Sequence, residues 1–214
     1  MFPARLTKGY QSFLDRRFAS ERARYQELAG LGQSPSIMVI GCVDSRVSPE
    51  VIFDAAPGEL LVARNVANLV PRYEAPTTPQ EDISHQHGTS AALEFAVRAL
   101  RVSDIVVLGH AFCGGIKAFA SDDAPLSSSD FIGRWMSQIS PAAEAIKAPK
   151  EDREAYLRQL EFASVELSLR NLMTFPFVRK AVEAGELKLH GAYFGVASGK
   201  LLVRNEKTAT FEPV

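Results

Sequence analysis

Short, continuous apolar runs alternate along the chain with longer segments in which apolar residues recur every three or four positions. Two runs, 36–41 and 105–109, are apolar at nearly every position, which indicates strands buried on both faces. A third strand is expected at 59–63, and 187–194 and 200–204 predict a closing hairpin or a pair of edge strands. Strands that alternate with helices predict an α/β fold, with a mostly parallel central β-sheet flanked by helices.

Helical periodicity appears between these strands and before the first one. The stretch 7–29 is rich in arginine, glutamate and aromatic residues, which predicts an N-terminal helical arm spanning about residues 1–30. Because its aromatic side chains need a surface to cover, the arm should pack on its own domain or on a second subunit. Further helices are expected at 49–54, 89–100, 114–119, 131–139, 151–173 and 176–184. The whole chain, 1–214, is expected to form one domain with a long loop at 71–88.

Composition and charge exclude several classes of function. The 214 residues are 46% hydrophobic and 23% charged, which is ordinary for a soluble globular domain. The formal net charge of −1 gives no electrostatic footprint for nucleic acid or an anionic membrane. No apolar run reaches the roughly 18–20 residues of a membrane helix, and the N-terminus lacks the apolar core of a secretory signal. We therefore expect no nucleic-acid or membrane partner, and a cytoplasmic location.

The chain has two cysteines, Cys42 and Cys113, and each follows a predicted buried strand. His110 comes directly after the second of these strands. Because the carboxyl ends of parallel strands meet at one edge of a sheet, the three side chains should converge if the strands are neighbours. Two thiolates and one imidazole suit Zn²⁺, and three protein ligands are typical of a catalytic zinc with an open position. Either cysteine alone could instead be a small buried apolar side chain, and a disulfide is not expected in a cytosolic protein.

Asp44 and Arg46 lie two and four residues beyond Cys42. A guanidinium can hold a carboxylate through two parallel hydrogen bonds, so two states of Asp44 are possible. Asp44 either ligates the zinc and closes the site, or pairs with Arg46 and leaves the fourth position to water. An ordinary salt bridge at a strand end is the alternative, and the adjacent ligand set argues against it. Gly114 begins a predicted helix and can present its N–H to a bound substrate.

Two segments, 42–46 (CVDSR) and 110–115 (HAFCGG), resemble the zinc-binding motifs of the β-class carbonic anhydrases. Two more, 64–68 (RNVAN) and 168–178 (SLRNLMTFPFV), also match that family, the second being similar to its plant-type branch. The resemblance extends over most of the chain. It implies reversible hydration of CO₂ to bicarbonate and a proton, with one zinc per chain and attack by zinc-bound hydroxide.

The resemblance also implies roles for individual polar residues. Asp44 would accept a hydrogen bond from the hydroxide, and Arg46 would orient Asp44. Gln33, nine residues before Cys42, matches a family glutamine that donates to bicarbonate or CO₂. By its own chemistry, a lone glutamine before a strand is usually only a polar cap, so its significance comes from the resemblance.

The apolar wall of the implied pocket departs from the plant-type pattern. Val66 is as expected, whereas Leu61 and Phe95 stand where that branch has phenylalanine and tyrosine. The wall stays apolar, so CO₂ binding should survive, but the missing tyrosine hydroxyl bears on proton transfer or substrate orientation. Phe95 also lies on the core-facing stripe of its helix, which gives it a purely structural alternative. In this family the pocket forms across a dimer interface, so a homodimer or a tetramer of two dimers is expected.

Two other functions are compatible with the same residues. One keeps the zinc hydroxide but acts on a linear CO₂ analogue such as carbonyl sulfide or carbon disulfide. The other is a non-catalytic zinc scaffold whose site Asp44 keeps closed. Gln33 argues against permanent closure, because the closed branch of the family generally lacks this glutamine.

Overall fold

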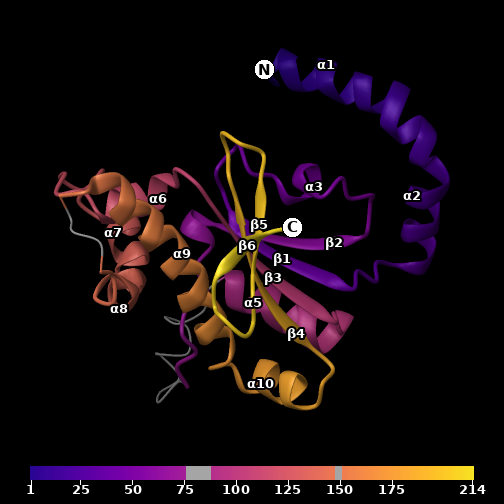
Figure 1. Ribbon diagram of the computed structural model, residues 1–214. Helices are drawn as coiled ribbons and strands as arrows, with labels where there is room; N and C mark the ends of the chain where they lie inside the picture. The colour runs from indigo at the N-terminus through magenta and orange to yellow at the C-terminus, as the bar shows by residue number, and fades with distance from the viewer. Residues whose placement is uncertain (76–87, 148–150) are drawn as a thin grey trace.

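The computed structural model describes residues 1–75, 88–147 and 151–214. At its centre is a six-stranded sheet with the order β2-β1-β3-β4-β5-β6 (Figure 1). The strands are β1 (Ile37–Cys42), β2 (Leu60–Asn65), β3 (Asp104–His110), β4 (Lys188–Phe194), β5 (Leu201–Arg204) and β6 (Phe211–Pro213). The strands β2, β1, β3 and β4 are parallel, and β5 and β6 pair antiparallel to their neighbours. The predicted α/β fold with a mostly parallel sheet is therefore confirmed.

Helices precede the sheet and connect its strands. The N-terminal arm consists of α1 (Ala4–Phe13), the π-helical segment η1 (Leu14–Phe18) and α2 (Ala19–Leu31). The others are α3 (Pro49–Ile52), η2 (Val66–Asn68), α5 (Gly88–Glu94), η3 (Phe95–Leu100), α6 (Gly114–Phe119), α7 (Phe131–Met136), η4 (Ser137–Ile139), α8 (Ser140–Ala143), α9 (Arg153–Leu172) and α10 (Pro176–Glu183). Each helix expected from the sequence is present, with small shifts at the ends. Within the described part of the chain, no helix is long and apolar enough to span a bilayer.

The C-terminal strands differ in part from the prediction. β4 and β5 form the expected hairpin, but β4 lies inside the sheet because its other side pairs in parallel with β3. The edge strand on this side of the sheet is β6, which the sequence did not indicate. At three residues it is too short to show an alternating pattern. The loop expected at 71–88 lies mostly outside the described residues.

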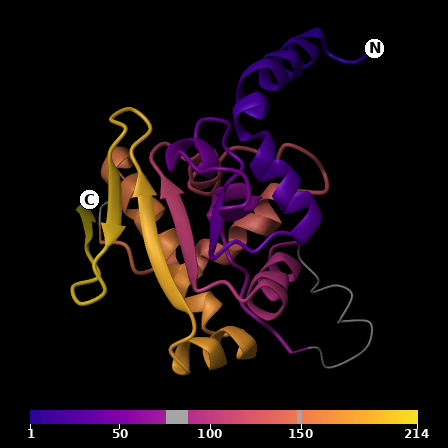
Figure 2. The ribbon, with the colours of Figure 1, turned by 90° about the vertical axis from the view of Figure 1, so that its right-hand side faces the viewer.

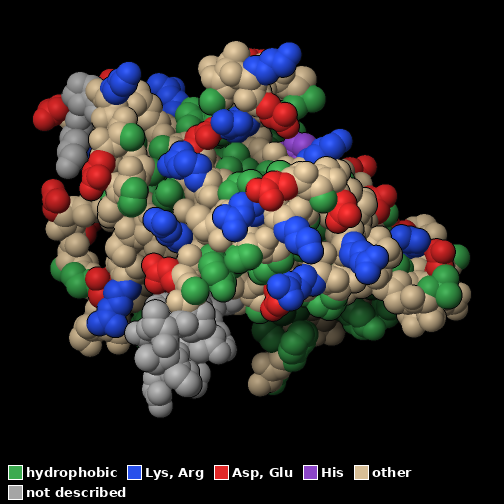
Figure 3. Space-filling model, turned by 90° about the horizontal axis from the view of Figure 1, so that it is seen from below, with side chains coloured by type: hydrophobic (Ala, Val, Ile, Leu, Met, Phe, Trp, Pro, Cys, Tyr) green, Lys and Arg blue, Asp and Glu red, His purple; other side chains and the backbone are tan. Residues whose placement is uncertain are grey.

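The two faces of the sheet are covered unequally. On one face, Met38 and Ile40 of β1 and Ile105 of β3 pack against α5, α9 and α10, and this cluster is the main core. The opposite face carries a smaller cluster around Val39 and Leu108, with several neighbours only partly buried. The burial of β1 and β3 on both faces confirms that prediction. In the face shown in Figure 3, basic and acidic side chains are interspersed.

A glycine brings α9 close to the end of β3. A Cβ at Gly109 would lie 2.6 Å from Cγ2 of Val165 on α9, which is closer than side chains pack. In the β3–β4 register, Gly109 is paired with Tyr193. Without a side chain at this position, α9 can approach the point where β3 turns into α6. That point proves to be the functional site.

The N-terminal arm extends away from the sheet (Figures 1 and 2). In residues 4–31, all of which the structure describes, no side chain is buried. Arg17 and Arg24 donate hydrogen bonds to backbone carbonyls in the loop before β2, and so attach the arm to its own chain. Three aromatic rings of the arm pack against one another: Phe13, Phe18 and Tyr25. The arm is helical as predicted, and the large apolar side chains of Leu6, Tyr10 and Leu31 stay exposed on it.

Candidate metal centre

Three buried side chains converge at the carboxyl ends of two neighbouring parallel strands. Cys42 is the last residue of β1, His110 is the last residue of β3, and Cys113 is the residue before α6. Each is at most 3% exposed, and one donor atom from each lies within 4.8 Å of the others. Both cysteines are free thiols. The structure thus brings together the three ligands proposed from the sequence.

The arrangement of these donors fits Zn²⁺. The two sulfurs are 4.0 Å apart, close to the roughly 3.8 Å that two thiolates span on a tetrahedral zinc. His110 Nδ1 lies 2.9 Å from the carbonyl oxygen of Ala111, where it can donate its proton and leave Nε2 for the metal. Nε2 is buried and has no hydrogen-bond partner among the described residues. Zn²⁺ is therefore the cofactor that this donor set accommodates.

Without metal, the two thiols differ sharply in acidity. Their mutual hydrogen bond lowers the pKa of Cys42 to about 4, although burial opposes this. The same contact, together with burial, raises the pKa of Cys113. Burial alone would lower the pKa of His110, but interaction with the Cys42 sulfur raises it overall. One thiolate is therefore favoured before metal arrives, and binding must release the proton of Cys113 and that of any protonated His110.

Asp44 is held by Arg46 beside this cluster. Nε and Nη2 of Arg46 donate to the two carboxylate oxygens at 2.9 and 2.7 Å, and the backbone N–H of Arg46 donates to one of them at 3.0 Å. These bonds hold the pKa of Asp44 well below its usual range. Nη2 also donates to the carbonyl oxygen of Phe112 at 3.0 Å. Among the described residues, the group of close donors consists of the two thiols and the imidazole, so the Asp44 carboxylate faces Arg46 instead.

Arg64 of β2 fixes the loop that carries Asp44. Its Nε donates to the carbonyl oxygen of Cys42 at 2.8 Å, and its Nη2 donates to that of Asp44 at 2.7 Å. The sequence pointed to the segment that contains Arg64 but gave this residue no role. Only the β1–β2 pairing shows which carbonyl groups it reaches.

A buried carboxyl group on α9 also reaches the site. Glu161 is 6% exposed, and its Oε1 accepts a hydrogen bond from the backbone N–H of Cys113 at 3.1 Å. The sequence reasoning missed this residue. A signal was present, since Glu161 falls on the buried stripe of its helix with Leu160, Ser164, Val165 and Ser168. A charged residue on such a stripe is uncommon unless it has a partner.

The pocket residues suggested by the family resemblance are distributed over several places. Val66 opens η2 and lines a hollow of about 550 Å³ together with Arg64 and Trp135. Gly114 is exposed at the start of α6. Leu61 packs at the margin of the main core. Phe95 is 46% exposed, so the core-facing position expected for it from the helical periodicity is wrong.

Gln33 is exposed and precedes β1, whereas Cys42 ends that strand. Six residues of strand extend about 20 Å. Gln33 and the metal cluster of the same chain therefore lie at opposite ends of β1, so this chain alone does not bring them together.

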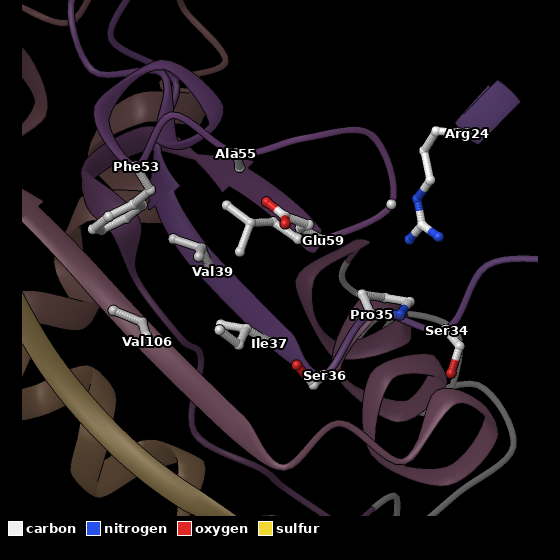
Figure 4. Close-up of a pocket in the computed structure, with 12 residues that line it drawn as sticks. Arg24, Ser34, Pro35, Ser36, Ile37, Val39, Phe53, Ala55, Glu59 and Val106 are labelled. Carbon is white, nitrogen blue, oxygen red and sulfur yellow. The ribbon is translucent and has the colours of Figure 1, made fainter. Parts of the chain in front are cut away.

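A second hollow, of about 540 Å³, lies over the less covered face of the sheet (Figure 4). Ile37, Val39 and Val106 form its floor, and Arg24 and Glu59 lie at its margin. Its described lining residues include none of the metal-binding group. We therefore assign the chemistry to the cluster at the strand ends.

Comparison with known proteins agrees with this assignment. The carbonic anhydrase family model matches residues 37–201. "Beta carbonic anhydrase 5, chloroplastic" of Arabidopsis thaliana is 35% identical over 187 residues, covering 86% of this chain and 59% of the relative. The solved structure of the β-carbonic anhydrase CcaA superposes with a TM-score of 0.83 at 27% identity, covering 98% of this chain and 91% of that one. A tetrameric β-carbonic anhydrase of Sordaria macrospora superposes with a TM-score of 0.73 at 28% identity, covering 92% of this chain and 94% of that one.

A mostly parallel α/β sheet with two cysteines and one histidine at its carboxyl edge defines a class of zinc-binding proteins. Within that class, this chain belongs to the β-carbonic anhydrase family. The resemblance drawn from the sequence motifs is confirmed. The chain spans 59% of the length of the Arabidopsis relative.

Proposed function

We propose that this protein catalyses the reversible hydration of CO₂ to bicarbonate and a proton. One observation carries the proposal: both oxygens of Asp44 are engaged by Arg46 next to the cluster of two thiols and an imidazole. Three protein ligands with a restrained neighbouring carboxylate are the pattern of a catalytic zinc rather than a structural one. The β-carbonic anhydrase relatives support the same reaction.

Each residue around the cluster has a separate role in this reaction. Zinc, when bound, supplies the Lewis acidity that activates a water molecule near neutral pH. Asp44, kept ionised by Arg46, would accept a hydrogen bond from that water and orient it toward the substrate. Val66 packs in the same apolar cluster as Cys42 and Cys113, where it would offer CO₂ an apolar contact. The N–H of Gly114, in the first turn of α6, is available to a bicarbonate oxygen.

Stopped-flow CO₂ hydration, measured with the zinc content of the same sample, tests this function. The assay runs from about pH 6.5 to 9, around the pKa near 7 typical of a zinc-activated water. We expect turnover in zinc-loaded protein and little in Asp44→Asn with the same zinc content. Absence of turnover at every pH with one zinc per chain would contradict the proposal and favour a scaffold. Turnover of carbonyl sulfide or carbon disulfide without turnover of CO₂ would contradict the assignment of CO₂ as the substrate.

We further propose that the active unit is a homodimer or a larger assembly in which Gln33 of one copy serves the metal cluster of another. Gln33 is exposed and far from its own cluster, and the ring of Phe95 is partly open to solvent. Several apolar side chains of the arm, among them Leu6, Tyr10 and Leu31, are exposed, which supports contact with a second copy. The Sordaria macrospora relative is described as tetrameric.

Mixing two inactive variants tests whether the site is shared. If Gln33 serves another copy, an Asp44→Ala chain paired with a Gln33→Ala chain contains one intact site. Random exchange should then restore about a quarter of the wild-type sites. If Gln33 served its own chain, both sites would stay defective, and no recovery after demonstrated subunit exchange would refute the proposal.

We also propose a cytoplasmic location. Both cysteines are free, and thiol ligands persist best in a reducing compartment. The Arabidopsis relative is named as chloroplastic, which makes a plastid the competing outcome. Imaging of the full chain with a C-terminal fluorescent fusion in its native cell would distinguish the two.

A further inference from the structure

The peptide group between Phe112 and Cys113 is held from both sides. Its carbonyl oxygen accepts a hydrogen bond from Nη2 of Arg46 at 3.0 Å. Its N–H donates to Oε1 of Glu161 at 3.1 Å. One side of this peptide is thus fixed by the residue that orients Asp44, and the other by a carboxyl group on α9.

The backbone conformation at Phe112 is unfavourable, so other interactions must hold this peptide in place. Phe112 adopts a φ of 59°, in the left-handed region that a residue with a side chain occupies only at a cost of about 1–2 kcal/mol. Its side chain is 64% exposed, so packing does little to hold it. The two hydrogen bonds to the peptide therefore fix its plane, and with it the direction in which Cys113 leaves the backbone.

Glu161 is itself held by Tyr193. The hydroxyl of Tyr193 donates to Oε2 at 2.6 Å, so each carboxyl oxygen of Glu161 has one donor. Tyr193 is 6% exposed, and its ring lies 4.4 Å from that of Phe162. Burial, and then the Glu161 carboxylate, raise the pKa of Tyr193, so its hydroxyl keeps the proton that it donates.

Stability alone is a poor account of this arrangement. Burying a carboxyl group costs free energy, and even a paired buried charge is often no better than apolar packing. A hydrogen bond to a charged acceptor is, however, strong and directional. The expected benefit is therefore in orientation of the peptide that carries Cys113.

We propose that Glu161 is a positioning residue for the metal ligand Cys113, and that Tyr193 positions Glu161. Glu161 acts through the 112–113 peptide and does not touch the metal. The proposal deepens the proposed function and rests on it for the identity of the metal. It adds a polar connection from β4 through α9 to the Asp44–Arg46 pair.

Three variants separate positioning from folding. Glu161→Met with Tyr193→Phe removes both polar groups at nearly constant volume, which limits the loss of stability. Glu161→Gln keeps an oxygen for the Cys113 N–H and an amide for the Tyr193 hydroxyl, without the charge. Glu166→Gln is the matched control, because Glu166 lies on the same helix but pairs with Arg204 of β5.

The measurements are the zinc dissociation constant by chelator competition, the thiolate-to-metal absorption band of the cobalt-substituted protein, and the melting temperature. We expect the double variant to bind zinc about 10- to 100-fold more weakly, with a shifted cobalt band. Glu161→Gln should recover most of the affinity, and Glu166→Gln should match the wild type.

Zinc affinity and a cobalt spectrum unchanged in the double variant, with only a lower melting temperature, would overturn the proposal. If the double variant does not fold, Glu161→Gln is compared with Glu166→Gln, and equal zinc affinities would overturn it. Failure of the wild type to bind zinc would instead refute the metal assignment. Zinc binding without CO₂ hydration would refute the proposed function alone, so these failures are distinguishable.

Discussion

Arg46 donates a hydrogen bond to the carbonyl oxygen of Phe112 at 3.0 Å, although the two residues are 66 positions apart. The same guanidinium engages both oxygens of Asp44. Arg46 thereby joins the loop that follows Cys42, the last residue of β1, to the loop after β3 that carries Cys113. The planar guanidinium has several N–H donors in fixed directions and can bind Asp44 and Phe112 at once. The ammonium group of a lysine lacks this donor geometry.

Replacing Arg46 with lysine should therefore lower kcat/KM for CO₂ hydration by about 100-fold, as small misplacements in active sites do. The charge remains, so zinc content should stay near that of the wild type. Arg24→Lys is the matched control, because Arg24 donates to a backbone carbonyl remote from the cluster. Wild-type turnover in Arg46→Lys would show that CO₂ hydration does not require the guanidinium geometry of Arg46.

Cys42→Ser should lose zinc and all turnover, since a hydroxyl is a poor substitute for a thiolate ligand. Metal analysis of the purified variant checks the first part, and stopped-flow hydration the second. A variant that is both fully loaded with zinc and active would remove Cys42 from the ligand set.

Gly109→Ala should destabilise the fold by about 1–3 kcal/mol, the usual cost of overpacking a core. The added methyl group would lie 2.6 Å from Val165, on the helix that also carries Glu161. Val165→Ala should relieve the clash, so the double variant should be more stable than the sum of the two single effects predicts. Urea unfolding of all four proteins measures this, and strictly additive effects would rule out the contact.

Metal-free protein should be less stable in acid than near pH 8. Cys42 has a folded pKa of about 4, below its unfolded value of about 8.5, so the unfolded chain binds more protons between these limits. Its contribution to stability is present above the unfolded pKa and is lost as the pH falls toward 4. For Cys113 the pKa is raised, so its contribution is lost as the pH rises above its ordinary value.

Urea unfolding in chelator and reductant, from about pH 5 to 8, tests the Cys42 part of this prediction. The free energy of unfolding should rise with pH in His110→Ala protein, and less steeply in the Cys42→Ala/His110→Ala double variant; His110 is removed from both because its own pKa depends on Cys42. If the free energy of unfolding changes equally steeply with pH in the two proteins, Cys42 does not titrate in this way.

The sequence by itself indicated most of the elements and the three candidate metal ligands. Continuous apolar runs placed β1 and β3, helical periodicity placed α5 and α9, and the motifs around Cys42 and His110 identified the ligands. These features are local, because they depend on residues a few positions apart. The edge strand β6 was missed, since three residues carry too little pattern.

Only the tertiary structure decided how the ligands are supported. The contacts from Arg46 to Phe112 and from Glu161 to Cys113 join residues 66 and 48 positions apart, and depend on strand pairing and on the close approach of α9 at Gly109. The structure likewise placed Gln33 at the far end of β1 from its own cluster. A sequence pattern records which side chains are present and their local periodicity. The direction of one peptide group depends on packing among distant segments.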